Sequence, residues 1–232
     1  MPSRNSVKVY SEDSYYHVYN RGVEKREIFK DDQDYSVFLS YLRTYLTPKD
    51  TISLQYILAN NKVSRQEKDK ALKQLKLKNY SDDISLHCYA LLPNHFHLLV
   101  KQNKNTLSRF MNSLCTRYAM YFNRKYNRVG VLFQDMYKGV LVQDDDQLLT
   151  LSRYINLNPV TLLGFSATNW SKAPYPCSLP EYLGLKSTPW LKTDAILEYF
   201  SRTTPKSTYE DFLGMDVDPM FYANQAIDFD TD

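Results

Sequence analysis

Two apolar runs separated only by Pro93-Asn94 constrain the fold of this chain most strongly. Ile84–Leu92 (ISLHCYALL) and His95–Val100 (HFHLLV) are each as long as a typical strand and rich in apolar residues. Proline and asparagine favour turns, because proline fixes φ and asparagine bonds its own backbone. The pattern therefore predicts two strands joined by a tight turn in an antiparallel sheet.

Strand and helix patterns alternate along the rest of the chain. Tyr15–Asn20 (YYHVYN) is aromatic and β-branched before Arg21-Gly22, which predicts a strand and a turn, and Val129–Val142 also has strand character. Apolar residues at three- and four-residue steps, capping acids and proline stops predict the helices. These run from Asp31 or Asp32 to about Leu46, from Asn105 or Thr106 to Tyr126, from about Gln147 to Leu157 before Pro159, and from Thr193 to Phe200.

This order of elements predicts an α+β fold. Several connections are hairpins, so we expect one antiparallel sheet with helices packed on one face, a ferredoxin-like or RRM-like sandwich. Residues 49–80 interrupt the pattern with the lysine-rich run SRQEKDKALKQLKLKNY, which predicts a charged helical insertion. We expect one domain over residues 1–164 and an acidic C-terminal extension over residues 165–232 that packs on this domain or flanks it.

Composition excludes several classes of protein. The 232 residues are 43% hydrophobic and 24% charged, as in ordinary globular chains, and no apolar run reaches the length of a membrane span. The three scattered cysteines lack the paired spacing of a zinc ribbon or a disulfide framework. We expect a cytoplasmic protein with no membrane partner.

The net charge of +3 is unevenly distributed. Residues 165–232 contain 5 Lys/Arg and 10 Asp/Glu, a net charge of −5, which leaves 24 against 16 and a net charge of +8 for residues 1–164. A basic body favours a polyanion as partner, and nucleic acid is the commonest one. The basic residues within 101–138 are equally consistent with a solvated helix face.

Half of the four histidines, His95 and His97, lie in one apolar strand. Side chains at i and i+2 of a strand point to the same face, so both imidazoles should stand side by side while Phe96 faces the core. Such a pair is a ready ligand set for one divalent cation. The spacing alone is also typical of two histidines that bind no metal, and neither an HxHxD nor an HExxH pattern is present.

A second polar pair occurs in RYINLNPV, which begins at Arg153. Tyr154 and Asn158 are four residues apart and share one face of the predicted helix. If this helix packs over the histidine strand, a cation could be bound by His95, His97 and the Asn158 amide oxygen, beside the Tyr154 hydroxyl. The same spacing also fits a packing tyrosine and a C-terminal helix cap.

Three motifs follow one another within roughly residues 10–185: YHVYNRG (Tyr16–Gly22), LLPNHFHLL (Leu91–Leu99) and RYINLNPV (Arg153–Val160). Together they resemble the REP-associated tyrosine transposases, which are single-tyrosine HUH transposases related to insertion-sequence enzymes. The resemblance implies that residues 1–164 form the catalytic domain. It implies the metal ligands His95, His97 and Asn158 and the nucleophile Tyr154.

The activity that the resemblance implies is that of a metal-dependent DNA transposase and endonuclease. It would nick and rejoin single-stranded DNA through a 5′-phosphotyrosine, with Mg²⁺ or Mn²⁺ as cofactor. The partner would be single-stranded or hairpin-forming DNA, in the nucleoid, and both a monomer and a homodimer are compatible with the resemblance. His17 and Asn20 belong to the first motif and are candidates to support the site. The expected DNA-binding residues are Arg21, Arg109, Arg117, Arg124, Lys125 and Arg128.

Other interpretations predict different observations. A domesticated relative would bind hairpin DNA without cleaving it, and an RNA-binding α+β domain would bind no metal and form no covalent intermediate. Tyr118, Tyr121 and Tyr126 are alternative nucleophiles, although Tyr118 and Tyr121 fall on the apolar face of their predicted helix. The presence of the histidine pair together with Tyr154 and Asn158 favours the enzyme.

Overall fold

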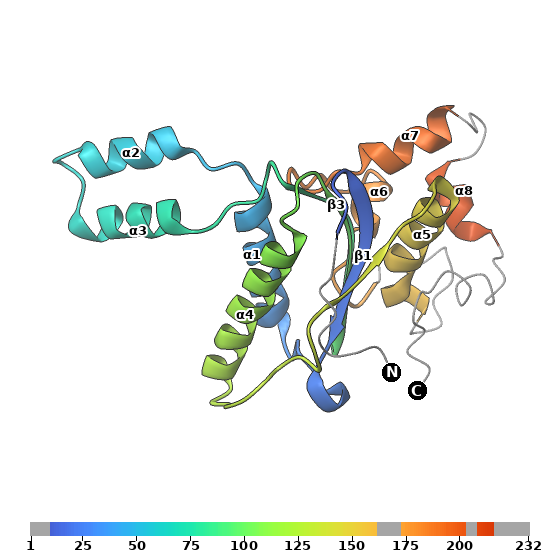
Figure 1. Cartoon of the computed structure of the whole chain (residues 1–232), viewed down its shortest axis with the longest axis horizontal. Helices are drawn as coiled ribbons and strands as arrows, with labels where there is room; N and C mark the ends of the chain where they lie inside the picture. The colour runs from blue at the N-terminus through green and yellow to red at the C-terminus, as the bar shows by residue number, and fades with distance from the viewer. Residues whose placement is uncertain (1–9, 162–172, 203–207, 216–232) are drawn as a thin grey trace.

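A four-stranded antiparallel sheet in the order β2-β3-β1-β4 lies at the centre of the part of the chain that the structure describes (Figure 1). The computed structural model describes residues 10–161, 173–202 and 208–215. The Pro93-Asn94 turn joins β2 to β3 with Leu92 opposite His95, so the predicted hairpin is confirmed. The strands are β1 (Ser14–Arg21), β2 (Ile84–Leu92), β3 (His95–Gln102) and β4 (Lys138–Leu141).

Both faces of the sheet carry apolar side chains, and this decides where the helices lie. In β3, Phe96 and Leu98 join one buried cluster, whereas Leu99 joins a second cluster on the other face. The first face is covered by α1 (Asp32–Leu46) and α4 (Leu107–Lys125), and the second by α5 (Asp145–Thr161), α6 (Leu179–Tyr182), α7 (Asp194–Arg202) and α8 (Tyr209–Gly214) (Figure 1). The α+β class is confirmed. Helices were expected on one face of the sheet only, but they cover both faces, because the apolar side chains of the second face must also be removed from water.

Local sequence sets most helix ends. The Asp31 side chain accepts a hydrogen bond from the Asp34 amide and caps α1, and α1 and α4 closely match their predicted ranges. In contrast, α5 continues through Pro159, where the sequence predicted an end near Asn158. Proline removes one amide donor, and the burial of Ile155 and Val160 in the second cluster offsets that loss.

The segment from Val129 to Val142 forms less β structure than predicted. Within it only β4 is a strand, and an isolated bridge joins Phe133 to Gly22, just before the short 3₁₀ helix η1 (Val23–Lys25). The Gln134 amide donates to the Arg21 carbonyl at 2.8 Å. The loop before β4 therefore lies against the end of β1 instead of extending the strand.

Residues 49–80 form two helices, α2 (Thr51–Ala59) and α3 (Arg65–Lys76), which pack on each other and project from the body (Figure 1). The Asn79 amide closes the base of this pair by donating to the carbonyls of Thr44 at 3.2 Å and Thr47 at 2.7 Å. No residue of α2 is buried, and Ile52 and Tyr56 are well exposed.

The described residues after 172 pair with the edge of β2 and contribute α6, α7 and α8 to the second face of the sheet. Bridges join Cys177 to Ala90 and Leu191 to Leu86. Tyr209 of α8 accepts a hydrogen bond from the Asn156 amide at 2.9 Å, which ties α8 to α5. Among the described residues, no helix is both long and apolar enough to cross a bilayer.

Candidate active site

One face of β1 and β3 carries three histidines and a tyrosine. The odd-numbered side chains of both strands point to the α5 side of the sheet, so His95 and His97 share that face with His17 and Tyr19. Phe96 points the other way, into the cluster under α1 and α4. The sequence spacing therefore produces the expected pair of imidazoles.

The His95 and His97 rings are in contact but differ in exposure. Their centroids are 4.9 Å apart with the planes at 90°. His97 is buried and His95 is half-buried. Asn94 Oδ1 lies 2.6 Å from His95 Nδ1, and because an amide oxygen only accepts, Nδ1 carries the proton. In the neutral ring, Nε2 of His95 is then the nitrogen with the lone pair.

His17 forms a hydrogen bond with one member of the histidine pair, His97. Its Nε2 atom lies 2.9 Å from His97 Nδ1, and the two rings stack with centroids 5.1 Å apart. Burial lowers the pKa of His97 well below its usual value, and the neighbouring His17 and His95 lower it further. His97 is therefore neutral near pH 7, the form that binds metals.

Helix α5 places Tyr154 over these histidines. The Tyr154 ring centroid lies 5.5 Å from that of His97 and 6.3 Å from that of His17, edge-on to both. Leu151 and Ile155 on the same helix enter the second buried cluster, so the helix is anchored on the sheet. The condition under which the two sequence motifs can form one site is thus met.

Asn158 lies one turn beyond Tyr154 on α5 and is half-buried. Because α5 does not end at Pro159, Asn158 is a helical residue rather than a cap. Residues four apart share one helix face, so Asn158 and Tyr154 point to the same side of α5.

Asn20, a candidate to support the site, does not face the histidines. Strand alternation turns its side chain to the other face of the sheet. There its amide donates to the Asp135 carbonyl at 3.1 Å, and its Oδ1 atom accepts from the Arg21 amide at 2.9 Å. Asn20 therefore holds the loop before β4 against β1.

Arg21 is the expected DNA-binding residue that lies beside the histidines. It is opposite His95 in the β1–β3 pairing, and its Nε donates to Gln134 Oε1 at 3.1 Å. Arg21 and Gln134 line a pocket of about 240 Å³ together with Tyr19 and Lys138. Tyr19, Gln134 and Lys138 were not predicted from the sequence, although the alternation that predicted the histidine face also places Tyr19 two residues from His17.

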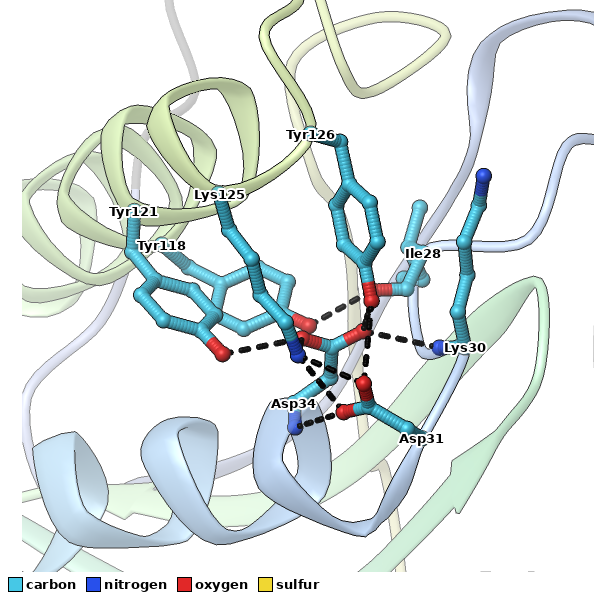
Figure 2. Close-up of polar contacts among 8 residues, drawn as sticks. All are labelled: Ile28, Lys30, Asp31, Asp34, Tyr118, Tyr121, Lys125 and Tyr126. Carbon is cyan, nitrogen blue, oxygen red and sulfur yellow. Dashed lines mark hydrogen bonds and ion pairs between the residues drawn. The ribbon is translucent and has the colours of Figure 1, made fainter.

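The other expected DNA-binding residues lie on or just after α4, across the sheet from α5. Lys125 forms ion pairs with Asp31 at 2.7 Å and Asp34 at 2.8 Å (Figure 2). Arg117 stacks on Tyr41, with Cζ 3.9 Å from the ring centroid. The structure therefore does not bring these cations to the histidine site. The set comprises Arg109, Arg117, Arg124, Lys125 and Arg128.

The alternative nucleophiles on and after α4 are engaged elsewhere. Tyr118 is fully buried, burial raises its pKa, and its hydroxyl donates to the Ile28 carbonyl at 2.5 Å. The hydroxyls of Tyr121 and Tyr126 donate to the Asp34 carboxylate at 2.9 Å and 2.8 Å (Figure 2). All three stabilise the contact between α1 and α4, far from the histidine face.

The donors at the histidine face fit a divalent cation bound with few protein ligands. In the described ranges, no three His, Cys, Asp or Glu side chains gather in a way that could hold a metal. The face instead offers two imidazoles whose Nδ1 atoms are engaged by Asn94 and His17, the usual orientation of metal-binding histidines. An amide oxygen such as that of Asn158 is the donor type that would complete the set.

The segment that contains this site is similar to known proteins. Residues 56–158 match the family model described as "Transposase IS200 like", and this range includes β2, β3, α4 and both Tyr154 and Asn158. No curated protein matches the chain. A solved structure described as "Structure of the REP associates tyrosine transposase bound to a REP hairpin" is similar at 11% sequence identity with a TM-score of 0.47, over 81% of this chain and 96% of that chain.

Proposed function

Since residues 56–158 match the family model of IS200-like transposases, we propose that this protein nicks and rejoins single-stranded, hairpin-forming DNA with Tyr154 as the nucleophile. The observation that carries the proposal is the position of the Tyr154 ring, 5.5 Å from His97 and edge-on to it. A tyrosine and a histidine pair far apart in the sequence meet on one face of the sheet, and this arrangement is what metal-assisted attack by a phenol requires.

The proposed reaction is a transesterification. The Tyr154 oxygen attacks the scissile phosphorus as the bond from phosphorus to the 3′ oxygen breaks. The phenol loses its proton, and the released 3′ oxygen gains one. The product carries a 5′-phosphate bonded to Tyr154 and a free 3′-hydroxyl. Rejoining is the reverse attack, and it needs no ATP because the phosphotyrosine bond retains the energy of the phosphodiester.

The chain's own residues prepare this reaction. His95 and His97, with the Asn158 amide, would hold Mg²⁺ or Mn²⁺, which when bound polarises the scissile phosphate. Asn94 and His17 fix the orientation of the two rings. Burial keeps His97 neutral and therefore competent as a ligand.

A covalent adduct tests the proposal. The protein is incubated with single-stranded hairpin DNA and Mn²⁺, and denaturing gels followed by mass spectrometry identify the modified residue. We expect an adduct on Tyr154 that is absent in Tyr154→Phe. His95→Ala and His97→Ala should each lower its yield by roughly a hundredfold or more, since electrostatic stabilisation of the transition state is lost.

Tyr121→Phe is the matched control, since it also removes one tyrosine hydroxyl but on the far side of the sheet. It should leave the adduct unchanged. An adduct that persists in Tyr154→Phe, or that maps to Tyr121, would refute the assignment of the nucleophile. Tight binding of hairpin DNA without an adduct would show a binding protein that does not cleave.

A further inference from the structure

An open pocket adjoins the histidine face at the end of the sheet. It has a volume of about 240 Å³, and His95 belongs both to its wall and to the candidate metal site. The other walls are the ends of β1 and β4 and the loop before β4, which supplies Gln134 and Asp135. Pockets for drug-sized ligands measure about 300–1,000 Å³. This one therefore suits a smaller unit, such as one nucleotide of a chain that continues outside it.

Two cations of this pocket are held in defined positions. Lys138 lies opposite Tyr19 in the β1–β4 pairing, and its ammonium nitrogen is 5.3 Å from the Tyr19 ring centroid. Arg21 donates through Nε to Gln134 Oε1. The carboxylate in the wall, Asp135, accepts a hydrogen bond from the Met136 amide at 2.8 Å and so has part of its charge satisfied locally.

The pocket is continuous with the proposed reaction centre through two side chains. The ring centroids of His95 and His97 are 4.9 Å apart. The Tyr19 ring stacks on His17 and His97, with centroid distances of 4.8 Å and 5.8 Å. A single strand whose phosphate lies at the histidines would pass directly from them to Lys138. Consecutive phosphates along a strand would thus meet the histidines and the pocket in turn.

We propose that this pocket binds the nucleotide next to the scissile phosphate, with Lys138 and Arg21 on its backbone phosphate and Gln134 at the edge of its base. The inference rests on the proposed function, because that function defines the scissile phosphate. It adds a subsite that ties the register of the DNA strand to Tyr154. Lys138 binds substrate here and takes no part in the bond changes.

Coupling between one lysine and one phosphate tests this subsite. The non-cleaving Tyr154→Phe protein is titrated into a fluorescein-labelled DNA hairpin with single-stranded flanks, at fixed salt, and anisotropy gives Kd. Each flanking phosphate is replaced in turn by an uncharged methylphosphonate. One linkage should weaken binding about tenfold, as expected for a charge-assisted hydrogen bond. In the Tyr154→Phe, Lys138→Met protein the same linkage should have almost no effect.

Lys192→Met is the matched control, because it removes the same charge from an exposed lysine at the opposite edge of the sheet. With that substitution the sensitive linkage should stay sensitive. Equal losses at every linkage, unchanged by Lys138→Met, would overturn the subsite even if wild-type protein forms the Tyr154 adduct. A single coupled linkage in a protein that forms no adduct would keep the pocket as a DNA site and reject the cleavage reaction.

Discussion

At the scale of single residues, the hydrogen bond between His17 and His97 has the clearest chemical meaning. Both side chains are buried, at 3% and 4% exposure, so the bond excludes water as the partner of His97 Nδ1. A histidine whose first nitrogen is held in this way presents the second in a fixed direction. His17 is therefore a positioning residue for the proposed metal ligand.

His17→Ala should lower the affinity of the DNA-free protein for Mn²⁺ by roughly 10- to 100-fold, the usual cost of losing a partner of a metal-binding histidine. His17→Gln should restore most of the affinity, because its amide also bonds His97 Nδ1. Mn²⁺ titration followed by electron paramagnetic resonance measures the effect. His87→Gln, at a buried histidine elsewhere in β2, serves as the control. Equal losses in His17→Ala and His87→Gln would indicate general destabilisation instead.

At the scale of elements, a buried carboxylate joins α1 to α4. Asp34 is completely buried and accepts from Lys125, Tyr121, Tyr126 and the Lys30 amide (Figure 2). Such a charge is tolerated in the core only because every partner is present. The same partners explain why the expected DNA-binding Lys125 serves the fold.

Asp34→Asn should reduce the free energy of unfolding by about 3 kcal/mol, because the partly buried Lys125 ammonium and the tyrosine hydroxyls lose the negative charge that they bind. Urea denaturation measures it. Glu24→Gln makes the same carboxylate-to-amide change in the exposed Glu24–Arg26 pair, and it should cost less than about 1 kcal/mol. Similar losses in the two variants would contradict the special role of Asp34.

The α2–α3 pair should be removable. Asn79 bonds the Thr47 carbonyl at 2.7 Å, so the two ends of the segment already lie together. Replacing residues 50–78 by a short Gly/Ser linker should change the free energy of unfolding by less than about 1 kcal/mol, since closing a short loop costs little. Urea denaturation and the adduct gel test this. Loss of folding would show that α2 and α3 are part of the core.

At the scale of the whole molecule, buried histidines link stability to pH. Burial, with the charges of Lys101 and Lys192, lowers the pKa of His87 to about 4, and His97 is shifted in the same direction. Above about pH 6.5 both folded and unfolded chains hold these rings neutral. Between about pH 6.5 and 4 the unfolded chain binds protons at these histidines and the folded chain does not. The free energy of unfolding therefore decreases as the pH is lowered.

His87 should contribute a slope of about 1.4 kcal/mol per pH unit within that window. His87→Phe, which keeps a ring beside Tyr15, should remove this slope without lowering stability above about pH 7, because both ring nitrogens of His87 are buried without a hydrogen-bond partner. Urea titrations from pH 4 to 7.5 (roughly the window of the shift) provide the measurement. An unchanged slope in His87→Phe would mean that His87 is protonated in the folded protein.

The sequence by itself determined the local features of this protein. Turn chemistry at Pro93-Asn94, capping at Asp31 and strand alternation at His95-Phe96-His97 act over a few residues, so their outcomes could be predicted from the residues themselves. Tyr118 could likewise be recognised as a core residue from its helical spacing.

Only the tertiary structure decided which distant groups meet. The register of β1 on β3 brings His17 to His97, and the packing of α5 on the second apolar face brings Tyr154 above both. The same packing carries α5 past Pro159, whereas the pairing of α1 with α4 commits Lys125 to ion pairs with Asp31 and Asp34. These outcomes depend on free energies summed over whole faces of the sheet, which no single stretch of sequence contains.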